Sequence, residues 1–160
     1  MESKNKHVEV DDSMLPISQE EENLARLYLL SRISERAIRA LFDTEFDPSC
    51  LHDTLKKNYC KLKDLEKNRI INPSQWRLLY PTNSDPQSSK FDVSLMTALL
   101  KHLANVSPYD KFPLLTDTST SADLTRIRYY RNFISHVSMK EEDTINFTEA
   151  WDDISCVCIT

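Results

Sequence analysis

The chain of 160 residues contains no glycine, and this absence constrains its fold more than any other feature of the sequence. Average usage would give about eleven glycines in a chain of this length. Glycine-rich phosphate loops and dinucleotide-binding fingerprints therefore cannot exist here, which excludes the nucleotide-binding folds that depend on them. Tight left-handed turns also rely mainly on glycine, whereas helices can be capped by Ser, Asp, Asn and Pro. The composition predicts an all-α fold.

Helical periodicity and helix start signals predict a bundle of about five main helices plus one short helix. The main helices are expected at residues 18–42, 48–67 and 91–106 and again from about 120 and 146, and the short helix at residues 73–80. The expected start signals are Ser18 with Glu21, Asp47-Pro48, Asn72-Pro73, Asp92, and Thr120 with Asp123. Residues 81–90 are rich in Pro, Ser, Asn, Asp and Gln and are predicted to form an exposed loop.

Charge divides the chain into an acidic leader and a neutral body. Residues 1–22 carry seven acidic and two basic side chains, which accounts for the whole net charge of −5. We expect residues 1–17 to be a disordered leader and residues 18–160 to form one domain. The last predicted helix stops without a capping signal, so we expect a fragment of a longer protein, cut at the C-terminus. A neutral body disfavours strong non-specific nucleic-acid binding and leaves room for a small local patch.

The four cysteines and four histidines follow none of the spacings typical of a metal site. We therefore predict neither a metal nor a cofactor. The N-terminus lacks an apolar signal region, and no apolar run approaches the roughly eighteen residues that span a bilayer. These features predict a cytoplasmic protein with reduced thiols and no membrane contact.

Residues 125–136 concentrate three arginines, an asparagine and a histidine in one stretch. Apolar residues at steps of three and four predict an amphipathic helix here; they are Leu124, Ile127, Tyr130, Ile134 and Val137. At about 100° per residue, Arg128, Asn132 and His136 form a row on the opposite face. Arg131 lies at the border of the apolar stripe, about 140° around the helix from His136. A permanent cation that grips phosphate and a ring that exchanges protons near neutral pH suit phosphodiester chemistry.

For both groups of basic residues in the chain, an ordinary structural or solvated role is the alternative to a functional one. Arg128 and Arg131 could be solvated or paired with acidic residues of neighbouring helices, with His136 placed near a helix C-terminal dipole. Residues 53–70 hold six cations and three acids, including Lys57 and Lys61, and form either an RNA track or an ordinary solvated face.

The segment Arg131-Asn132-Phe133-Ile134-Ser135-His136 resembles the R-x(4-6)-H signature of the HEPN superfamily of all-helical domains, in which Asn often follows the Arg. Its surroundings resemble the HEPN-like domain of DAZ-interacting zinc-finger ubiquitin ligases that bind RNA. The segments concerned are Trp76-Arg-Leu-Leu-Tyr-Pro81, Phe91-Asp-Val-Ser-Leu-Met96 and residues 122–132. The resemblance covers approximately residues 20–160.

This resemblance implies a helical bundle that pairs with a second copy and places the motif helices at the shared interface. In catalytic members the cleft between the copies cuts RNA without a metal. Carried onto this chain, Arg131 would stabilise the scissile phosphate, His136 would transfer a proton and Asn132 would orient the site. Arg126, Arg128, Lys57 and Lys61 would contact the RNA. No zinc-finger or RING-type cysteine set occurs in the chain, so ubiquitin ligase activity is not assigned to these residues.

Two functions remain open at this point. The first is an RNA-associated domain, a candidate metal-independent endoribonuclease that works as a homodimer. The second is a non-enzymatic dimerisation or adaptor module of a larger multidomain protein, such as a ubiquitin ligase or a signalling protein. The sequence does not settle whether Arg128, which aligns with His136 on the helix, or Arg131, which fits the motif, faces the site.

Overall fold

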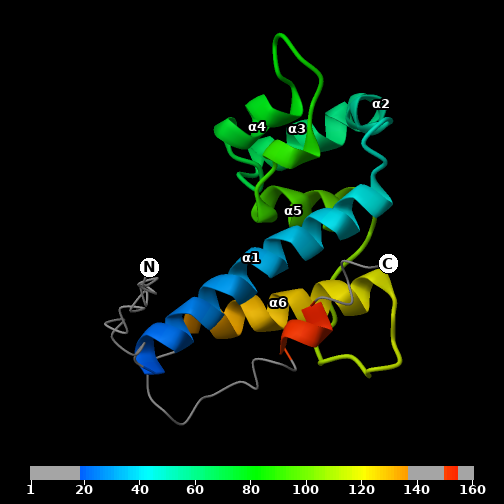
Figure 1. Cartoon of the computed structure of the whole chain (residues 1–160). Coiled ribbons are helices and arrows are strands. Elements are labelled where there is room, and N and C mark those ends of the chain that lie inside the picture. The colour runs from blue at the N-terminus through cyan, green and yellow to red at the C-terminus, as the bar shows by residue number, and fades with distance from the viewer. Residues whose placement is uncertain (1–18, 137–149, 155–160) are drawn as a thin grey trace, which may run out of the picture.

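The computed structural model describes residues 19–136 and 150–154, and every regular element in these ranges is helical (Figure 1). The elements are α1 (Gln19–Glu45), α2 (Leu51–Lys57), α3 (Tyr59–Lys67), α4 (Pro73–Leu79), the short 3₁₀ helix η1 (Ser88–Lys90), α5 (Val93–Leu103) and α6 (Thr120–His136). Residues 150–154 are also helical. The predicted all-α class is confirmed. Within the described ranges, no helix combines the length and the apolar character needed to cross a membrane.

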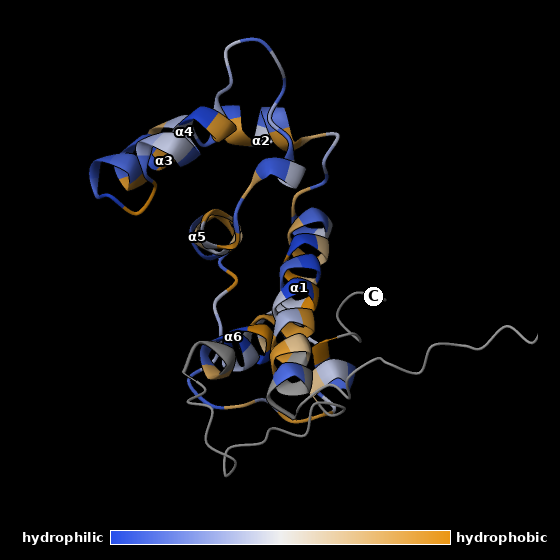
Figure 2. Cartoon of the chain, turned by 60° about the vertical axis from the view of Figure 1, so that its left-hand side comes forward, coloured by the Kyte–Doolittle hydropathy of each residue, from blue (hydrophilic) through white to orange (hydrophobic). Residues whose placement is uncertain are grey.

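The long helix α1 is the element that joins α5 and α6. It packs against α5, α6 and η1. Helix α6 runs beside α1 in the opposite direction, and α2, α3 and α4 lie on the other side of α5 from α6 (Figures 1 and 2). Arg39 of α1 attaches the segment before α5, because its guanidinium donates to the carbonyl oxygens of Ser88 and Phe91.

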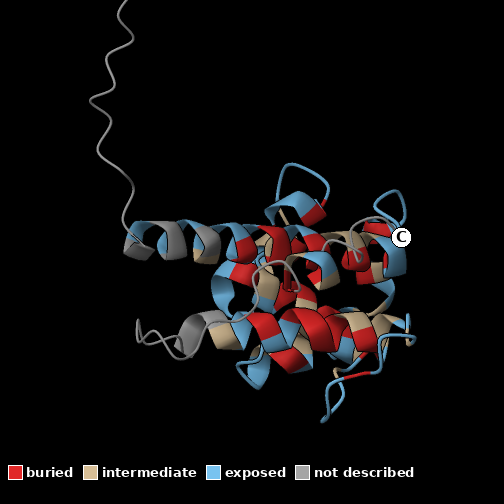
Figure 3. Cartoon of the chain, turned by 60° about the horizontal axis from the view of Figure 1, so that its bottom comes forward, coloured by how far each residue is buried: buried red, intermediate tan, exposed pale blue. Residues whose placement is uncertain are grey.

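A single apolar core joins these helices. Buried residues lie mostly where the helices face one another, and exposed residues lie on their outer sides and along much of the loops (Figure 3). The largest fully buried side chains are Phe42, Phe91, Ile38, Leu51, Leu55, Leu62, Ile71, Leu79, Leu95, Met96, Leu99 and Leu100. Full burial of one such side chain contributes about 1.5–3 kcal/mol to the free energy of unfolding. All helices from α1 to α5 supply members of this set, so they share one core.

The start signals of α4 and α5 are confirmed and are joined to each other. Asn72 accepts a hydrogen bond from the Gln75 backbone N–H (2.9 Å), and the Gln75 side chain accepts one from the Asn72 N–H (3.0 Å). Asp92 caps α5 by accepting from the Leu95 N–H at 2.8 Å. The buried Gln75 amide also donates to both carboxylate oxygens of Asp92, at 3.1 and 3.0 Å. One polar network therefore fixes two helix starts.

The single helix expected at residues 48–67 is wrong, because Asn58 divides it into α2 and α3. The Asn58 side chain donates to the Thr54 carbonyl oxygen at 2.9 Å, which is the kind of local bond that competes with a continuous helix. The start of α2 also differs from the prediction. Asp47 accepts from the Ser49 N–H at 2.8 Å in a turn, and α2 begins only at Leu51.

Two further boundaries differ from the sequence predictions. Helix α1 continues to Glu45, three residues beyond the expected end, and α5 is shorter than expected at both ends. The segment 81–90 is not wholly exposed, since Pro86 and Ser88 are buried and η1 lies at its end. The order of the helices is unchanged by these differences.

Among the residues that the structure describes, two occupy the left-handed backbone conformation although neither is glycine. Arg69 has φ 59° and Asn105 has φ 57°, and each follows the end of a helix. After α3, the Ile70 N–H donates to the Leu65 carbonyl and the Arg69 N–H donates to the Glu66 carbonyl, both at 2.9 Å. This is the Schellman arrangement, in which the left-handed residue is usually glycine. The glycine-free chain therefore places a residue with a Cβ where glycine is normally preferred.

Candidate functional site

Helix α6, which carries the motif, is capped by Ser119 at its N-terminus. The Ser119 side-chain oxygen accepts from the Ala122 N–H at 3.3 Å, and its carbonyl accepts from the Asp123 N–H at 3.0 Å. The expected capping box between Thr120 and Asp123 is wrong. The Asp123 carboxylate instead pairs with Arg126, 2.9 Å away, one turn further along the helix.

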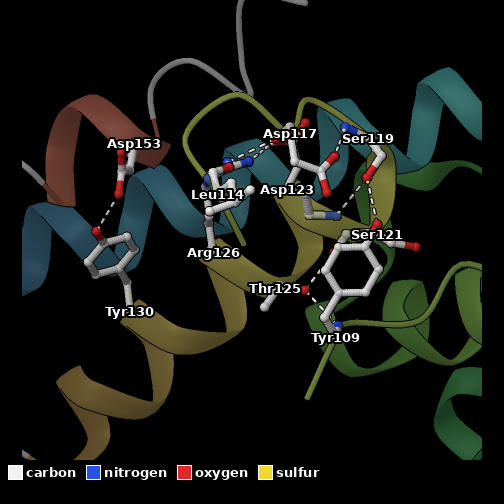
Figure 4. Close-up of polar contacts among 11 residues, drawn as sticks. Tyr109, Leu114, Asp117, Ser119, Ser121, Asp123, Thr125, Arg126, Tyr130 and Asp153 are labelled. Atoms are coloured by element: carbon white, nitrogen blue, oxygen red, sulfur yellow. Dashed lines mark hydrogen bonds and ion pairs between the residues drawn. The ribbon is translucent and has the colours of Figure 1, made fainter. Parts of the chain in front are cut away.

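Arg126 is buried, with 6% of its surface exposed, and it connects α6 to the preceding loop (Figure 4). Its guanidinium donates to the carbonyl oxygens of Leu114 at 2.7 Å and Asp117 at 2.9 Å, in addition to the Asp123 carboxylate. Burial is the main cause of a raised pKa at Asp123, and the adjacent Arg126 guanidinium offsets the rise only in part. Three of its five N–H donors bond inside the protein and its side chain is buried, which disfavours the predicted contact of Arg126 with RNA.

A second set of polar contacts holds the same loop, residues 107–119, against α6 (Figure 4). The Tyr109 N–H donates to the Thr125 hydroxyl at 2.7 Å, and that hydroxyl donates to the Ser121 carbonyl at 2.6 Å. The Tyr109 hydroxyl lies 3.0 Å from the Ser119 side-chain oxygen. Both the first and the last part of the loop are therefore attached to α6, although the sequence of the loop shows no periodicity.

Arg128, Arg131 and Asn132 line one groove of about 260 Å³ where α1, α5 and α6 meet. The other lining residues are Ile38 of α1, Val93 and Thr97 of α5, Pro108, and Leu124 and Ile127 of α6. Ile38, Leu124 and Ile127 belong to the core, so the groove has an apolar floor with two guanidiniums and an amide beside it. The structure thus brings together three of the predicted site residues. Both Arg128 and Arg131 line this groove, so the groove does not select one of them as the arginine of the site.

His136 is the last residue of α6, but its side chain lies outside the described residues. Its proton-transfer role therefore stays a prediction.

Helix α6 and the loop 107–119 also present two partly exposed aromatic rings. Phe112 is 45% exposed and Tyr129 is 51% exposed, and their ring centroids lie 4.9 Å apart with the planes at 68°. The buried ring of Tyr130 contacts both, and its hydroxyl donates to the Asp153 carboxylate at 2.5 Å. Sequence reasoning did not select Tyr129 or Phe112. The position of Tyr129, three residues before Asn132, was the one signal available.

Lys57 and Lys61 are exposed, but they belong to α2 and α3 and do not share the groove. Helix α5 lies between these helices and α6 (Figures 1 and 2). Two other cations of the basic strip, which comprises residues 53–70, are paired locally. Lys63 pairs with Glu66 at 2.5 Å, and Lys67 pairs with Asp64 at 3.4 Å. An RNA contact at Lys57 and Lys61 stays a prediction for a separate surface.

No group of three or more His, Cys, Asp or Glu side chains is placed to hold a metal ion in the described part of the chain.

Comparison with known proteins places most of the chain in one family of helical domains. The family model described as DZIP3/hRUL138-like HEPN matches residues 48–160, which include α2 to α6. The mouse E3 ubiquitin-protein ligase DZIP3 is 35% identical over 133 residues, and its human counterpart is 33% identical over 135 residues. These matches cover 76% of this chain but only 11% of each relative, so the chain corresponds to a small part of the length of these ligases. No solved structure matches the chain.

Proposed function

The chain belongs to the DZIP3/hRUL138-like HEPN family, and on this basis we propose that it is an RNA-associated domain whose contact surface is the groove beside α6. The observation that carries the proposal is the convergence of Arg128, Arg131 and Asn132 on that groove. A guanidinium stays charged at all relevant pH values and can grip one phosphate through two parallel hydrogen bonds. An apolar floor beside two such groups favours a ligand that combines phosphate with a planar apolar part.

The neutral body of the chain makes the location of the arginines important. Residues 23–160 hold eighteen acidic and eighteen basic side chains, so the domain has no general attraction for polyanions. RNA binding would therefore depend on the few cations placed at one surface, and the groove holds two of them.

As a nuclease, the domain would cleave RNA through the family motif. His136 would take the proton of a ribose 2′-hydroxyl, or give a proton to the leaving oxygen, as a general base or acid. The 2′-oxygen would attack the neighbouring phosphorus while the bond from phosphorus to the 5′-oxygen breaks, which leaves a 2′,3′-cyclic phosphate. Arg131 would stabilise the negative charge that builds up on the phosphate oxygens, and Asn132 would orient the scissile group.

The test is RNA cleavage in EDTA by the wild type and by the variants Arg131→Ala and His136→Ala. Arg77→Ala is a matched control, because Arg77 is an exposed arginine of α4, away from the groove. The proposal expects cleavage by the wild type and the control and strong loss in the two motif variants. Binding without cleavage would identify an RNA-binding module without nuclease activity. If the wild type neither binds nor cuts single-stranded or structured RNA, the proposal is wrong.

A second candidate is a dimerising adaptor within a larger protein of the ligase kind. The observation that favours it is an exposed apolar group near the start of α1, formed by Leu24, Tyr28 and Leu29, which are 56%, 64% and 46% exposed. This end of α1 lies beside the C-terminal end of α6 (Figures 1 and 3). Sedimentation of Tyr28→Glu and His136→Ala separates the candidates. Loss of self-association in either variant, with no RNA activity in the wild type, would favour the adaptor.

A further inference from the structure

Ser107 begins the loop 107–119 and is followed by Pro108, which lines the groove beside α6. The chain has seven prolines, and Pro108 is the only one that follows a serine or a threonine. A serine followed by a proline is the dipeptide that proline-directed protein kinases accept. The one dipeptide of this kind in the sequence therefore adjoins the groove that we propose as the binding surface.

The hydroxyl of Ser107 is accessible to an enzyme. Ser107 is exposed, and it lies in residues 105–109, which form neither a helix nor a turn. The ring of a following proline disfavours the helical conformation of the residue before it and favours an extended one. Protein kinases bind the acceptor serine in an extended segment. Neither burial nor a helix has to be undone at Ser107 before its hydroxyl is reached.

The neighbours of Ser107 fix its position relative to α6. Val106 is buried in the core, and the Tyr109 N–H donates to the Thr125 hydroxyl of α6 at 2.7 Å. Only two residues, about 7 Å of extended chain, separate Ser107 from this bond. Arg128 follows Thr125 by three residues, so the two side chains are neighbours on the surface of α6. A phosphate on Ser107 would therefore lie within reach of the Arg128 guanidinium.

The charges at the groove favour such a phosphate. Arg128 is exposed and makes no hydrogen bond or ion pair with the described part of the chain. None of the described residues that line the groove is acidic. A phosphoserine carries about 1.5–2 negative charges at pH 7 and three acceptor oxygens, and beside an arginine it forms charge-assisted hydrogen bonds.

We propose that Ser107 is a phosphorylation site for a proline-directed kinase, and that its phosphate binds Arg128 and closes the groove to other phosphate groups. The kinase transfers the terminal phosphoryl group of ATP. A bond forms from the phosphorus to the Ser107 oxygen, the bond from the phosphorus to the leaving oxygen of ADP breaks, and the hydroxyl proton is released. The effect on RNA binding rests on the proposed function, whereas the contact between the phosphate and Arg128 does not.

The first measurement locates the modification. The whole chain is incubated with a purified mitogen-activated protein kinase, ATP and Mg²⁺, and mass spectrometry identifies the phosphorylated residues. Ser107→Ala is the control, because it removes only the acceptor hydroxyl. Phosphate is expected on Ser107 of the wild type. A wild type that takes up no phosphate, or takes it up only at other residues, would overturn the site.

The second measurement follows the phosphate by phosphorus-31 nuclear magnetic resonance as the pH is varied. A neighbouring guanidinium stabilises the doubly charged phosphate, so the second pKa of the phosphoserine is expected to lie below its usual value of about 6. Arg128→Ala is expected to raise this pKa by about half a unit or more. Arg77→Ala, at an exposed arginine of α4, is the matched control and is expected to leave it unchanged. Equal values in the wild type and Arg128→Ala, both folded by circular dichroism, would overturn the contact.

The third measurement separates this inference from the proposed function. Fluorescence anisotropy gives the affinity of the unmodified and the phosphorylated protein for a labelled 2′-O-methylated RNA strand. Phosphorylation is expected to weaken binding about 10-fold or more, because a charge-assisted contact with Arg128 is lost. Equal affinity of the two forms would overturn the closing of the groove. If the unmodified protein does not bind the strand while the phosphate pKa responds to Arg128→Ala, the proposed function is wrong and the phosphate contact stands.

Discussion

Arg126 and Arg128 lie two positions apart in α6, yet Arg126 is buried against the loop 107–119 and Arg128 is exposed beside the groove. Two helical steps turn the side chain by about 200°, which is enough to separate the two environments. The carbonyl oxygens of Leu114 and Asp117 accept two hydrogen bonds from Arg126, whereas Arg128 faces the groove with Asn132. One arginine therefore stabilises the fold, and the other is available to a ligand.

The first prediction concerns stability. Arg126→Ala removes the partner of the Asp123 carboxylate and two donors to loop carbonyl oxygens. We expect the free energy of unfolding to fall by about 2–4 kcal/mol in denaturant titrations, because buried polar groups lose their partners. Arg128→Ala, the matched control, is expected to change it by less than about 0.5 kcal/mol. Similar losses in the two variants would contradict the separate roles.

The second prediction concerns the left-handed residue after α3. Arg69 has φ 59°, a conformation that costs roughly 1 kcal/mol for a residue with a Cβ and nothing for glycine. Arg69→Gly is therefore expected to increase the free energy of unfolding by up to about 1 kcal/mol and so to raise the midpoint of thermal unfolding. Lys67→Gly, two positions earlier within the helix, is the control and is expected to lower the midpoint. A lower midpoint for Arg69→Gly would show that its side chain contributes more than its backbone conformation costs.

The third prediction concerns acid. Partial burial alone would raise the pKa of Asp92, but hydrogen bonds from Ser94, Leu95 and Gln75 to the carboxylate lower this pKa below its usual value. A carboxyl with a lowered folded-state pKa stabilises the fold above its unfolded pKa, about 4, and loses this contribution as the pH falls through the folded value. Asp92→Asn keeps a helix-capping side chain and removes the titration.

Unfolding of the wild type and of Asp92→Asn at several pH values provides the measurement. The difference in stability between them is expected to be largest at neutral pH and to shrink below about pH 4. The control is Asp110→Asn, an exposed aspartate outside the helices. A difference that stays constant down to acid unfolding would show that Asp92 does not contribute in this way.

The features that the sequence predicted correctly depend on residues that lie close together in the chain. The helix start at Asn72-Pro73 follows from adjacent residues, and the shared face of Arg128 and Asn132 follows from a spacing of four residues. The features it missed depend on contacts made by segments without periodicity. The burial of Arg126 and the position of Phe112 follow from how residues 107–119 fold back on α6.

The helix break and the left-handed turn were missed for local reasons. The competition of the Asn58 side chain for a helix carbonyl leaves no periodic signal, since the apolar repeat continues through α2 and α3. A left-handed residue is normally anticipated from glycine, and this chain uses Arg69 and Asn105. The functional proposal depends on none of these differences, because the groove is lined by α1, α5, α6 and Pro108.

The fourth prediction concerns salt. If two guanidiniums supply the phosphate contacts, the logarithm of the affinity for a single strand should fall with the logarithm of the salt concentration with a slope of about −1.4. Arg128→Ala and Arg131→Ala should each reduce this slope by about half. A slope several times steeper in the wild type would show that a larger basic surface, such as the strip with Lys57 and Lys61, binds the RNA.

The most direct test of the groove is the nuclear magnetic resonance spectrum of the arginine side chains during titration with a 2′-O-methylated single strand of RNA, which lacks the attacking hydroxyl and is not cleaved. The guanidinium signals of Arg128 and Arg131 are predicted to shift together as the probe is added. The signal of Arg77, an exposed arginine of α4, is predicted to stay in place. Bound RNA that moves neither groove arginine would contradict the account.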